Sequence, residues 1–339
     1  LQHVEVNALG RVIRVLDNEP PLPGRDLHLS LDARLQQEAM DAFGDNNGAA
    51  VAIDPATGGV LALVSKPGFD PNLFVEGITY SDYQALQESE DKPLFNRALK
   101  GQYPPGSTVK PFIGLAGLET ETLGPEQKKY CPGFYQLPGH KHRYRDWKKQ
   151  GHGPMNLRDA ITQSCDVYYY DLAYQLGIDR LHDFLNEFGF GNRTGVDIAG
   201  ERGGLLPSRE WKRRARNQPW YPGETLITGI GQGYFLATPL QLAHATATLA
   251  AGGHRITPRV VQSVSAVGQD GSTPLEPVSS LLLAQRDPNN WDRVIEAMIQ
   301  VIEGARGTAK RIRNDNYQIA GKTGTAQVFT CLLYTSPSP

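Results

Sequence analysis

Residues 103–112 read Tyr103-Pro104-Pro105-Gly106-Ser107-Thr108-Val109-Lys110-Pro111-Phe112. The Pro-Pro-Gly sequence keeps the chain non-helical and predicts a sharp turn into a helix near Ser107. Pro111 is tolerated in that helix because first-turn backbone N–H groups have no intrahelical acceptor to lose. Ser107 and Lys110 are three residues apart, so they share one face of the helix and the amine can reach the hydroxyl.

This pair predicts a nucleophile and its base. A serine hydroxyl reacts slowly unless a base takes its proton, and a lysine amine is a base only where burial or another cation favours its neutral form. The partial positive charge of a helix N-terminus would stabilise an oxyanion formed there. Ser-x-x-Lys alone is weak evidence, because the pattern occurs on many solvated helix faces.

Two further motifs follow in the chain, Ser164-Cys165-Asp166 at the start of an apolar helix and Lys322-Thr323-Gly324 near the end of the sequence. Taken singly, they can be a helix N-cap and a strand end. Together with Ser107 they resemble the Ser-x-x-Lys, Ser-x-Asn, Lys-Thr-Gly series of penicillin-binding proteins and serine β-lactamases. Asp166 stands where that series has Asn, so it keeps an acceptor and loses the amide donor.

The resemblance implies a catalytic role for five side chains. Ser107 would be the acylated nucleophile and Lys110 its base. Ser164 would relay a proton between Lys110 and the leaving or attacking amine. Lys322 would add a second cation that favours neutral Lys110 and attracts the substrate carboxylate. Asp166 occupies the remaining catalytic position of the second motif.

The third motif implies a substrate-binding strand. Thr323 and Thr325 would hydrogen-bond the substrate carboxylate, while Gly324 lets the substrate backbone approach the strand edge. The backbone N–H groups of Ser107 and Thr325 would form the oxyanion hole.

Five longer segments resemble the penicillin-binding protein 2 family, the class B transpeptidases of the rod-elongation machinery. These segments are Pro71–Phe74, Tyr103–Ser107, Tyr144–Lys149, Gly177–Leu181 and Gly229–Tyr234. The resemblance covers nearly everything to Phe329. It implies a peptidoglycan D,D-transpeptidase that cross-links stem peptides through a Ser107 acyl-enzyme during cell elongation and is a target of β-lactams, with no cofactor in catalysis.

Three other functions use the same motifs. A serine β-lactamase must also deacylate with water, which usually requires a positioned carboxylate base, and the sequence identifies none. A D,D-carboxypeptidase would release D-alanine without forming cross-links. A non-enzymatic β-lactam sensor would be acylated without transfer to an amine, whereas an inert scaffold has no use for intact Ser107, Lys110 and Lys322.

The remaining pattern predicts an α+β fold. Two apolar runs, residues 49–53 and 60–64, flank Asp-Pro-Ala-Thr-Gly-Gly and predict a buried hairpin. Helices are expected over residues 33–43, 107–118, 156–176, 179–188, 238–251 and 290–304, and a late strand over residues 317–328. This order favours a mostly antiparallel sheet. The resemblance adds helices on both faces of the sheet and an all-helical subdomain.

Three regions are expected along the chain. Residues 1–24 carry short alternating apolar stretches and are interpreted as the remnant of an N-terminal, dimerisation-type pedestal domain. Residues 25–329 form the transpeptidase domain, which is incomplete at its C-terminal end. Residues 330–339 are interpreted as a non-native tail that resembles a translated sequencing adapter, the alternative being a genuine Ser/Pro-rich tail.

Charge and hydropathy restrict the partners. The chain has 34 Lys and Arg against 36 Asp and Glu, a formal charge of −2, so no bulk positive field argues for nucleic acid. It has no run of about 18 apolar residues that could span a bilayer. The resemblance implies a missing single-pass inner-membrane anchor, a periplasmic catalytic domain and an elongation-machinery glycosyltransferase as partner.

Metal-binding residue types gather between the first two motifs. Cys131 is followed by His140, His142, Asp146 and His152, and then by Cys165. Thiolate, imidazole and carboxylate groups are zinc ligands. The resemblance narrows a structural zinc site to Cys131, Asp146, His152 and Cys165. The alternatives are a Cys131–Cys165 disulfide, surface histidines and a small buried Cys165.

Overall fold

The computed structural model describes residues 2–20, 24–75, 77–265, 272–275 and 278–326. Contacts divide the chain into two compact units, one made of residues 1–30 and 261–277, the other of residues 31–260 and 278–339. No helix within the described ranges is long and apolar enough to cross a membrane. The tail expected at residues 330–339 lies outside the described residues.

The first unit consists of antiparallel strands. β1 (Gln2–Val6) pairs with β2 (Val12–Asn18), and the Asn7 side chain closes their turn by accepting the N–H groups of Leu9 and Arg11. β11 (Val261–Ser265) pairs with β3 (Asp26–Leu29) on one side and with β12 (Ser272–Pro274) on the other. The domain boundary expected at residue 24 stays a prediction.

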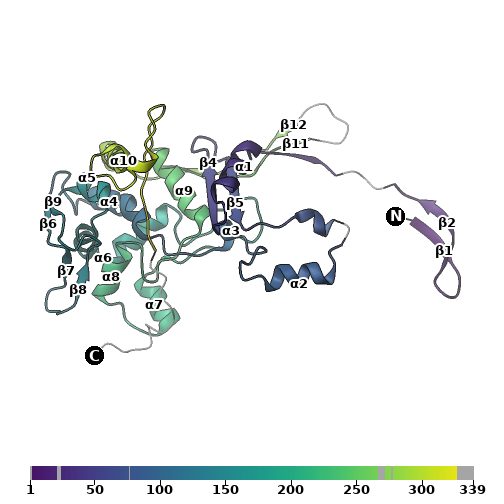
Figure 1. The fold of residues 1–339 in the computed structure, drawn as a ribbon, viewed down its shortest axis with the longest axis horizontal. Coiled ribbons are helices and arrows are strands. Elements are labelled where there is room, and N and C mark those ends of the chain that lie inside the picture. Colours follow the sequence, from purple (N-terminus) through teal and green to yellow (C-terminus); the bar gives the residue numbers. More distant parts are fainter. Residues whose placement is uncertain (1, 21–23, 76, 266–271, 276–277, 327–339) are drawn as a thin grey trace. The chain divides into compact units, whose positions relative to one another are not determined.

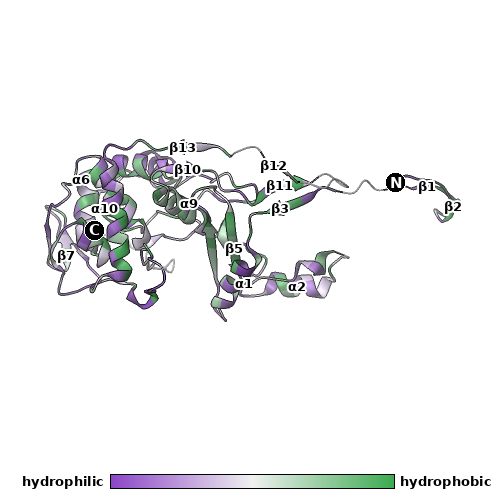
Figure 2. Cartoon of the chain, turned by 90° about the horizontal axis from the view of Figure 1, so that it is seen from above, coloured by the Kyte–Doolittle hydropathy of each residue, from purple (hydrophilic) through white to green (hydrophobic). Residues whose placement is uncertain are grey.

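The second unit contains the hairpin that the sequence predicts. β4 (Gly48–Ile53) and β5 (Val60–Lys66) pair antiparallel, and Figure 2 shows the apolar character of these strands. Asp54 stabilises the turn because its carboxylate accepts the backbone N–H of Ala56 and the hydroxyl of Thr57. Val60, Ala62 and Val64 alternate along β5 and are buried.

Helices cover this hairpin. α1 (Ala33–Ala42) contacts β5, and α9 (Pro239–Ala250) contacts β4. Asp32 caps α1, and the side chain of Gln36 bonds both the N–H and the carbonyl of Leu63 along β5. α9 begins with a capping box in which Thr238 and Gln241 bond each other's backbone N–H groups. α3 (Arg97–Lys100) contacts both strands.

An all-helical region forms the main core. In Figure 1 it gathers at one end of the second unit, and α9 lies between it and the hairpin. Its members are α4 (Lys110–Glu119), α5 (Leu157–Thr162), α6 (Asp166–Glu187), α8 (Pro222–Thr228) and α10 (Pro288–Glu303). α4 is buried over nearly its whole length, with Phe112 packed edge-on against Phe188 and Phe190. The helices expected at 156–176 and 179–188 instead divide near Ser164, and Gly177 bends α6.

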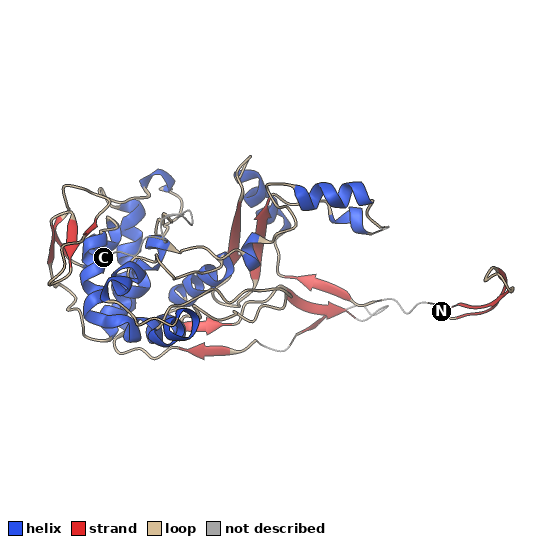
Figure 3. Cartoon of the chain, turned by 90° about the horizontal axis from the view of Figure 1, so that it is seen from below, coloured by secondary structure: helices blue, strands red, loops and turns tan. Residues whose placement is uncertain are grey.

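Shorter elements complete the unit (Figure 3). The paired strands are β6 (Lys129–Cys131) with β9 (Gly153–Met155), β7 (Phe134–Gln136) with β8 (Arg143–Arg145), and β10 (His254–Ile256) with β13 (Ser280–Leu282). The short helices are η1 (Pro71–Phe74), α2 (Tyr80–Glu88), η2 (Gly106–Val109), α7 (Arg209–Arg216) and η3 (Lys310–Ile312). Every named ladder among the described residues is antiparallel, so the predicted α+β class is confirmed.

The late strand predicted over residues 317–328 is wrong for its described part, residues 317–326, which contain no strand. A strand requires a neighbouring backbone with which to form a ladder. Within the described chain, the main-chain N–H groups and carbonyls of this segment make one bond to other backbone, from Gly321 N–H to the Met298 carbonyl. The apolar side chain of Ile319 is nevertheless partly buried, since it packs against the main core.

Candidate active site

Ser107 lies at the entrance to the buried helix α4. Gly106 has φ +58°, and residues 106–109 form the short η2 turn that leads into α4. Ser107 is half-buried and lines a cavity of about 1270 Å³. The turn therefore presents the serine hydroxyl at a helix N-terminus, as the sequence predicts.

Lys110 is fully buried beneath this turn and donates hydrogen bonds to Ser164 and Asp166 of the second motif. Its Nζ donates to the Ser164 carbonyl at 2.9 Å, to Ser164 Oγ at 3.2 Å and to Asp166 Oδ1 at 2.7 Å. None of the bonds that Lys110 makes in the described chain goes to Ser107. The carboxylate of Asp166 supplies the counter-charge that a buried ammonium needs. The sequence motifs place Asp166 in the catalytic set but do not predict its ion pair with Lys110.

Ser164 lies between two amines. Lys322 Nζ donates to Ser164 Oγ at 2.9 Å, on the same oxygen that Lys110 reaches. Ser164 has φ +57°, a left-handed conformation that costs energy for a residue with a Cβ. The strained backbone turns this hydroxyl toward both lysines, and Ser164 lines the same cavity as Ser107.

Lys322 is the lysine whose protonation is poised near neutral pH. Burial and the nearby Lys110 cation lower the pKa of Lys322 to about 7, and the Asp166 carboxylate partly opposes them. Such an amine can hold or release a proton under physiological conditions. It also remains available as a cation for an anionic ligand at neutral or lower pH.

The rest of the third motif lines the same cavity. Thr323, Gly324 and Thr325 all face it, and the hydroxyl of Thr323 lies 2.8 Å from that of Thr308. The structure therefore brings the three substrate-binding candidates beside Ser107, although they do not form the expected strand. Thr308 was not singled out by the sequence, since no motif marks it.

Trp147 forms one wall of the cavity. Its indole N–H donates to the carbonyls of Gln163 and Ser164, and its backbone N–H donates to Asp166 Oδ2 at 3.2 Å. The side chain is 59% exposed. It therefore offers an aromatic face to a ligand while bracing the second motif.

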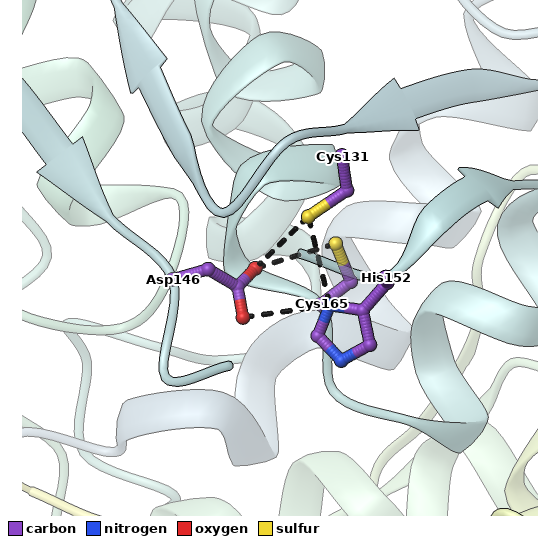
Figure 4. A group of neighbouring side chains, drawn as sticks. All are labelled: Cys131, Asp146, His152 and Cys165. Atoms are coloured by element: carbon purple, nitrogen blue, oxygen red, sulfur yellow. Dashed lines mark hydrogen bonds and ion pairs between the residues drawn. The ribbon is translucent and has the colours of Figure 1, made fainter. Parts of the chain in front are cut away.

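The four predicted metal ligands form one cluster behind this wall (Figure 4). Asp146 Oδ2 lies 3.6 Å from Cys131 Sγ and 3.4 Å from Cys165 Sγ. His152 Nδ1 lies 3.6 Å from Cys131 Sγ and 3.5 Å from Asp146 Oδ1. All four donor atoms lie within 4.8 Å of one another. His140 and His142 do not belong to this cluster.

This donor set fits zinc. Tetrahedral zinc with Zn–S about 2.3 Å and Zn–N or Zn–O about 2.1 Å separates neighbouring ligand atoms by roughly 3.4–3.8 Å. Four separations within the cluster, from 3.4 to 3.6 Å, fall in that range. Both cysteines are free thiols in the structure, so they do not form the alternative disulfide.

Hydrogen bonds within the cluster shift the pKa values of Cys131 and His152. The hydrogen bond with Cys165 lowers the pKa of Cys131 to about 5, although burial opposes the shift. Burial lowers the pKa of His152, but its bonds with Asp146 and Cys131 outweigh burial and raise it to about 9. A thiolate and a carboxylate thus lie together in a buried site, where a cation stabilises them.

An α+β domain with a serine at a buried helix N-terminus, two lysines converging on a second serine, and a Lys-Thr-Gly segment beside them has the architecture shared by penicillin-binding proteins and serine β-lactamases. Residues 48–334 match the family described as "Penicillin binding protein transpeptidase domain". The chain therefore belongs to the penicillin-binding protein transpeptidase domain family.

Known proteins resemble the chain over nearly its whole length. It is 46% identical over 327 residues, 96% of the chain, to "Peptidoglycan D,D-transpeptidase MrdA" of Acinetobacter baumannii. The crystal structure of Pseudomonas aeruginosa PBP2 in complex with WCK 5153 is 53% identical, with TM-score 0.86 over 91% of this chain and 69% of that one. The PBP2 of a Helicobacter pylori complex with MreC is 38% identical, with TM-score 0.81 over 96% of this chain and 59% of that one. The chain spans 48% of the A. baumannii protein, about half its length.

Proposed function

We propose that this chain is the catalytic region of a peptidoglycan D,D-transpeptidase that cross-links stem peptides during cell elongation. The observation that carries the proposal is the convergence of Lys110 and Lys322 on the Ser164 hydroxyl, in a cavity that Ser107 also lines. The proposal draws further support from the relative in A. baumannii that bears this name.

Acylation begins at Ser107. Its Oγ attacks the carbonyl carbon of the penultimate D-alanine, and neutral Lys110 takes the hydroxyl proton. The backbone N–H groups of Ser107 and Thr325 stabilise the oxyanion. The proton then passes through Ser164 to the leaving amine, the C–N bond breaks, and D-alanine departs as the free amino acid.

Transfer reverses these steps with a different amine. An amine of a neighbouring stem peptide attacks the Ser107 ester, and its proton passes through Ser164 to Lys110. The new amide forms the cross-link, and Ser107 Oγ recovers a proton as the ester bond breaks. A β-lactam would acylate Ser107 in the same way, but its leaving amine stays attached to the acyl group, so the adduct persists.

Charges around the lysines suit both directions of proton transfer. Both amines reach the Ser164 hydroxyl, Lys110 at 3.2 Å and Lys322 at 2.9 Å, so a proton can pass along this oxygen. When Lys110 holds the proton, Asp166 stabilises the resulting ammonium through the 2.7 Å ion pair. Lys322 would attract the carboxylate of the terminal D-alanine, with Thr323 and Thr325 as hydrogen-bond donors.

We also propose that Cys131, Asp146, His152 and Cys165 hold a structural zinc ion, and that catalysis itself uses no cofactor. Bound zinc would act as a structural cross-link and take no part in the reaction. Cys165 lies between Ser164 and Asp166, so the four ligands would join the segment of residues 131–152 to the second catalytic motif.

The cellular setting follows from the same proposal. Residues 25–329 would form the transpeptidase domain in the periplasm, and residues 1–24 would belong to a pedestal domain. A single-pass anchor would hold the protein in the inner membrane. A glycosyltransferase of the elongation machinery would be the partner that supplies glycan strands. A solved peptidoglycan synthase complex that coordinates polymerization and crosslinking, with a chain 36% identical to this one, supports such a partner.

The experiment that tests the function is labelling of the full-length protein with a fluorescent penicillin. The wild type and Ser81→Ala, an exposed serine at the start of α2, should both be labelled, whereas Ser107→Ala should not. Undiminished labelling of Ser107→Ala would overturn the proposal.

A second measurement separates the related activities. Incubation with a D-Ala-D-Ala stem peptide and an amine acceptor should yield the cross-linked product. Release of D-alanine without that product would indicate a carboxypeptidase, and rapid release of hydrolysed penicillin a β-lactamase. A stable adduct with no peptide reaction would indicate a sensor.

A further inference from the structure

Three cations line the cavity that Ser107 also lines. Arg145 ends β8, Lys148 follows it by three residues, and Arg306 lies shortly after α10. Arg145 and Arg306 are exposed, and Lys148 is half-buried. None of the three forms a salt bridge with another residue of the described chain, and the sequence after residue 326 contains no Asp or Glu. Their charges can therefore act on a bound molecule.

The carboxylates that line the cavity are already engaged. Asp166 pairs with Lys110 at 2.7 Å. Asp146 is only 4% exposed and accepts the backbone N–H groups of Lys148 and Val167 within the buried metal-ligand cluster. The whole chain has a formal charge of −2, so the positive lining is a local feature of the cavity and does not follow from the composition.

Two of the cations flank the aromatic wall of the cavity. Arg145 and Lys148 stand on either side of Trp147 in the sequence, and the Trp147 indole N–H donates to the Ser164 carbonyl at 3.1 Å. The carbonyl of Arg145 accepts the hydroxyl of Tyr170 at 3.3 Å, which holds this segment against α6. The fixed backbone places both cations beside the second motif.

The third cation borders the third motif. Arg306 precedes Gly307 and Thr308, and the hydroxyl of Thr308 lies 2.8 Å from that of Thr323. A Cβ added at Gly307 would lie 2.2 Å from the Val301 carbonyl oxygen, so this turn packs closely against the end of α10. Arg306 is therefore held beside the substrate-binding threonines.

The backbone beside Ser107 offers no charge of its own. The N–H of Gly106 donates to the Gly231 carbonyl at 2.8 Å. A Cβ added at Gly231, which has φ +71°, would lie 2.2 Å from the Gly106 carbonyl oxygen, and one added at Gly106 would lie 2.7 Å from the Thr325 carbonyl oxygen. Gln232 Nε2 donates to the same Thr325 carbonyl at 3.1 Å. Three backbone segments thus meet at a glycine junction with no side chain between them, so selectivity for the charge of a ligand has to come from the walls.

A cavity with these walls favours anionic ligands. Positive side chains around a cleft raise the local concentration of anions and speed their association. A guanidinium matches a carboxylate with two parallel hydrogen bonds, and an ammonium pairs with it as a point charge. Since Lys322 is the group proposed to meet the terminal carboxylate of the donor, the three wall cations suit a second carboxylate elsewhere in the ligand.

We propose that Arg145, Lys148 and Arg306 form a specificity element that selects acyl donors with a free carboxylate outside the reacting D-alanyl unit. A stem peptide whose acidic residue keeps its carboxylate belongs to this class, and one whose acidic residue is amidated does not. This inference rests on the proposed transpeptidase function and names the charge class of the donor for the same site.

Two penicillins that differ by one carboxylate test the inference on the full-length protein. Carbenicillin is benzylpenicillin with a carboxylate added to its acylamino side chain, so the ring carboxylate that both share cancels in the ratio of their acylation rate constants. Mass spectrometry of the acyl adduct over time gives both constants. In the wild type, the ratio of carbenicillin to benzylpenicillin should fall severalfold between roughly 0.02 and 0.5 M salt, because salt screens exposed charges.

Substitution of the cations should lower the same ratio. Each of Arg145→Gln, Lys148→Gln and Arg306→Gln removes one exposed or half-exposed attraction and should lower the ratio about two- to fivefold. The triple variant should lower it about tenfold or more. A triple variant with the wild-type ratio would overturn the inference.

A second triple variant controls for net charge. Lys141, Lys149 and Arg311 are exposed cations that do not line the cavity. Their joint replacement by Gln removes the same total charge and should leave the ratio at its wild-type value. If this control lowers the ratio as much as the cavity variant does, the effect comes from the charge of the whole protein, and the inference is wrong.

A pair of donor peptides extends the test to the natural reaction. Two D-Ala-D-Ala stem peptides that differ only in a glutamate or a glutamine should release D-alanine at different kcat/KM, with the glutamate peptide faster in the wild type. The cavity variant should lose most of this preference. Equal kcat/KM for the two peptides in the wild type would overturn the inference.

The outcomes distinguish this inference from the function on which it rests. If both penicillins acylate Ser107 and the ratio is the same in wild type and cavity variant, the inference is wrong and the function stands. If the cavity variant loses Tm and reacts more slowly with both penicillins to the same extent, the three cations are merely structural. If neither penicillin acylates the wild type, the function fails together with the inference.

Discussion

Replacement of Asp166 by Asn should destabilise the protein by about 3 kcal/mol. Asp166 Oδ1 lies 2.7 Å from Lys110 Nζ, and the two side chains are 15% and 0% exposed. Removing one partner of a buried ion pair costs about 3–5 kcal/mol, because the other charge stays buried without compensation. We expect the lower end, since the Asn oxygen still accepts one hydrogen bond and this edge of the site is slightly exposed.

The same substitution should lower the pH at which Lys322 loses its charge. The Asp166 carboxylate raises the pKa of Lys322, which burial and the Lys110 cation lower to about 7, so its loss lowers this pKa further. The ratio of acylation by a β-lactam carboxylate to acylation by its methyl ester should therefore fall at a lower pH in the variant than in the wild type.

Urea unfolding followed by tryptophan fluorescence measures the first effect, and fluorescent-penicillin labelling from pH 5 to 9 measures the second. Asp179→Asn is the matched control, because Asp179 pairs with Arg209 at 2.9 Å but the side chains are 65% and 59% exposed. An exposed pair of this kind contributes at most about 1 kcal/mol. If Asp166→Asn costs no more than this control, Lys110 is not held as a buried cation and the reasoning is refuted.

Three further outcomes are expected. Acylation by a β-lactam carboxylate, divided by acylation by its methyl ester, should fall as pH rises through about 7, because Lys322 loses its charge there; a flat ratio would contradict this assignment. Protein purified without chelator should contain stoichiometric zinc, and Cys131→Ser should lose the metal and several degrees of Tm. Metal-free wild type with a disulfide between the two cluster thiols would contradict the zinc site. Gly231→Ala should lower Tm more than Gly252→Ala: both have positive φ, but only Gly231 meets another atom, the Gly106 carbonyl oxygen at 2.2 Å. Equal losses, measured by thermal unfolding, would show that the backbone junction tolerates a side chain.

Local sequence signals predicted those elements whose cause is local. The helices predicted over residues 33–43 and 238–251 form as α1 and α9, capped by Asp32 and Thr238, and the turn at Asp54 lies between the two strands of the hairpin. The segment of residues 317–326 failed because a strand depends on a second backbone that the local pattern does not contain. Its apolar residue Ile319 is nonetheless partly buried against the main core.

The site divides in the same way. The three motifs predict Ser107, Ser164 and Lys322 by residue type and order. In the structure Ser107 and Ser164 line one cavity, and Lys322 Nζ donates to the Ser164 hydroxyl. The ion pair of Asp166 and the bond of Gln232 to Thr325 could not be read from the sequence. Each joins residues more than fifty positions apart and depends on side-chain directions that only the packed core determines.

The glycine junction also limits how this site can evolve under antibiotic selection. For an enzyme acylated by β-lactams, resistance requires a change that disfavours the drug and spares the peptide. At Gly106 and Gly231 even one added carbon would clash with a backbone oxygen, so we expect substitutions at these two positions to be rejected. Adaptive substitutions are therefore expected at the rim, where exposed Arg306 lines the cavity and can change without disturbing the backbone around Ser107.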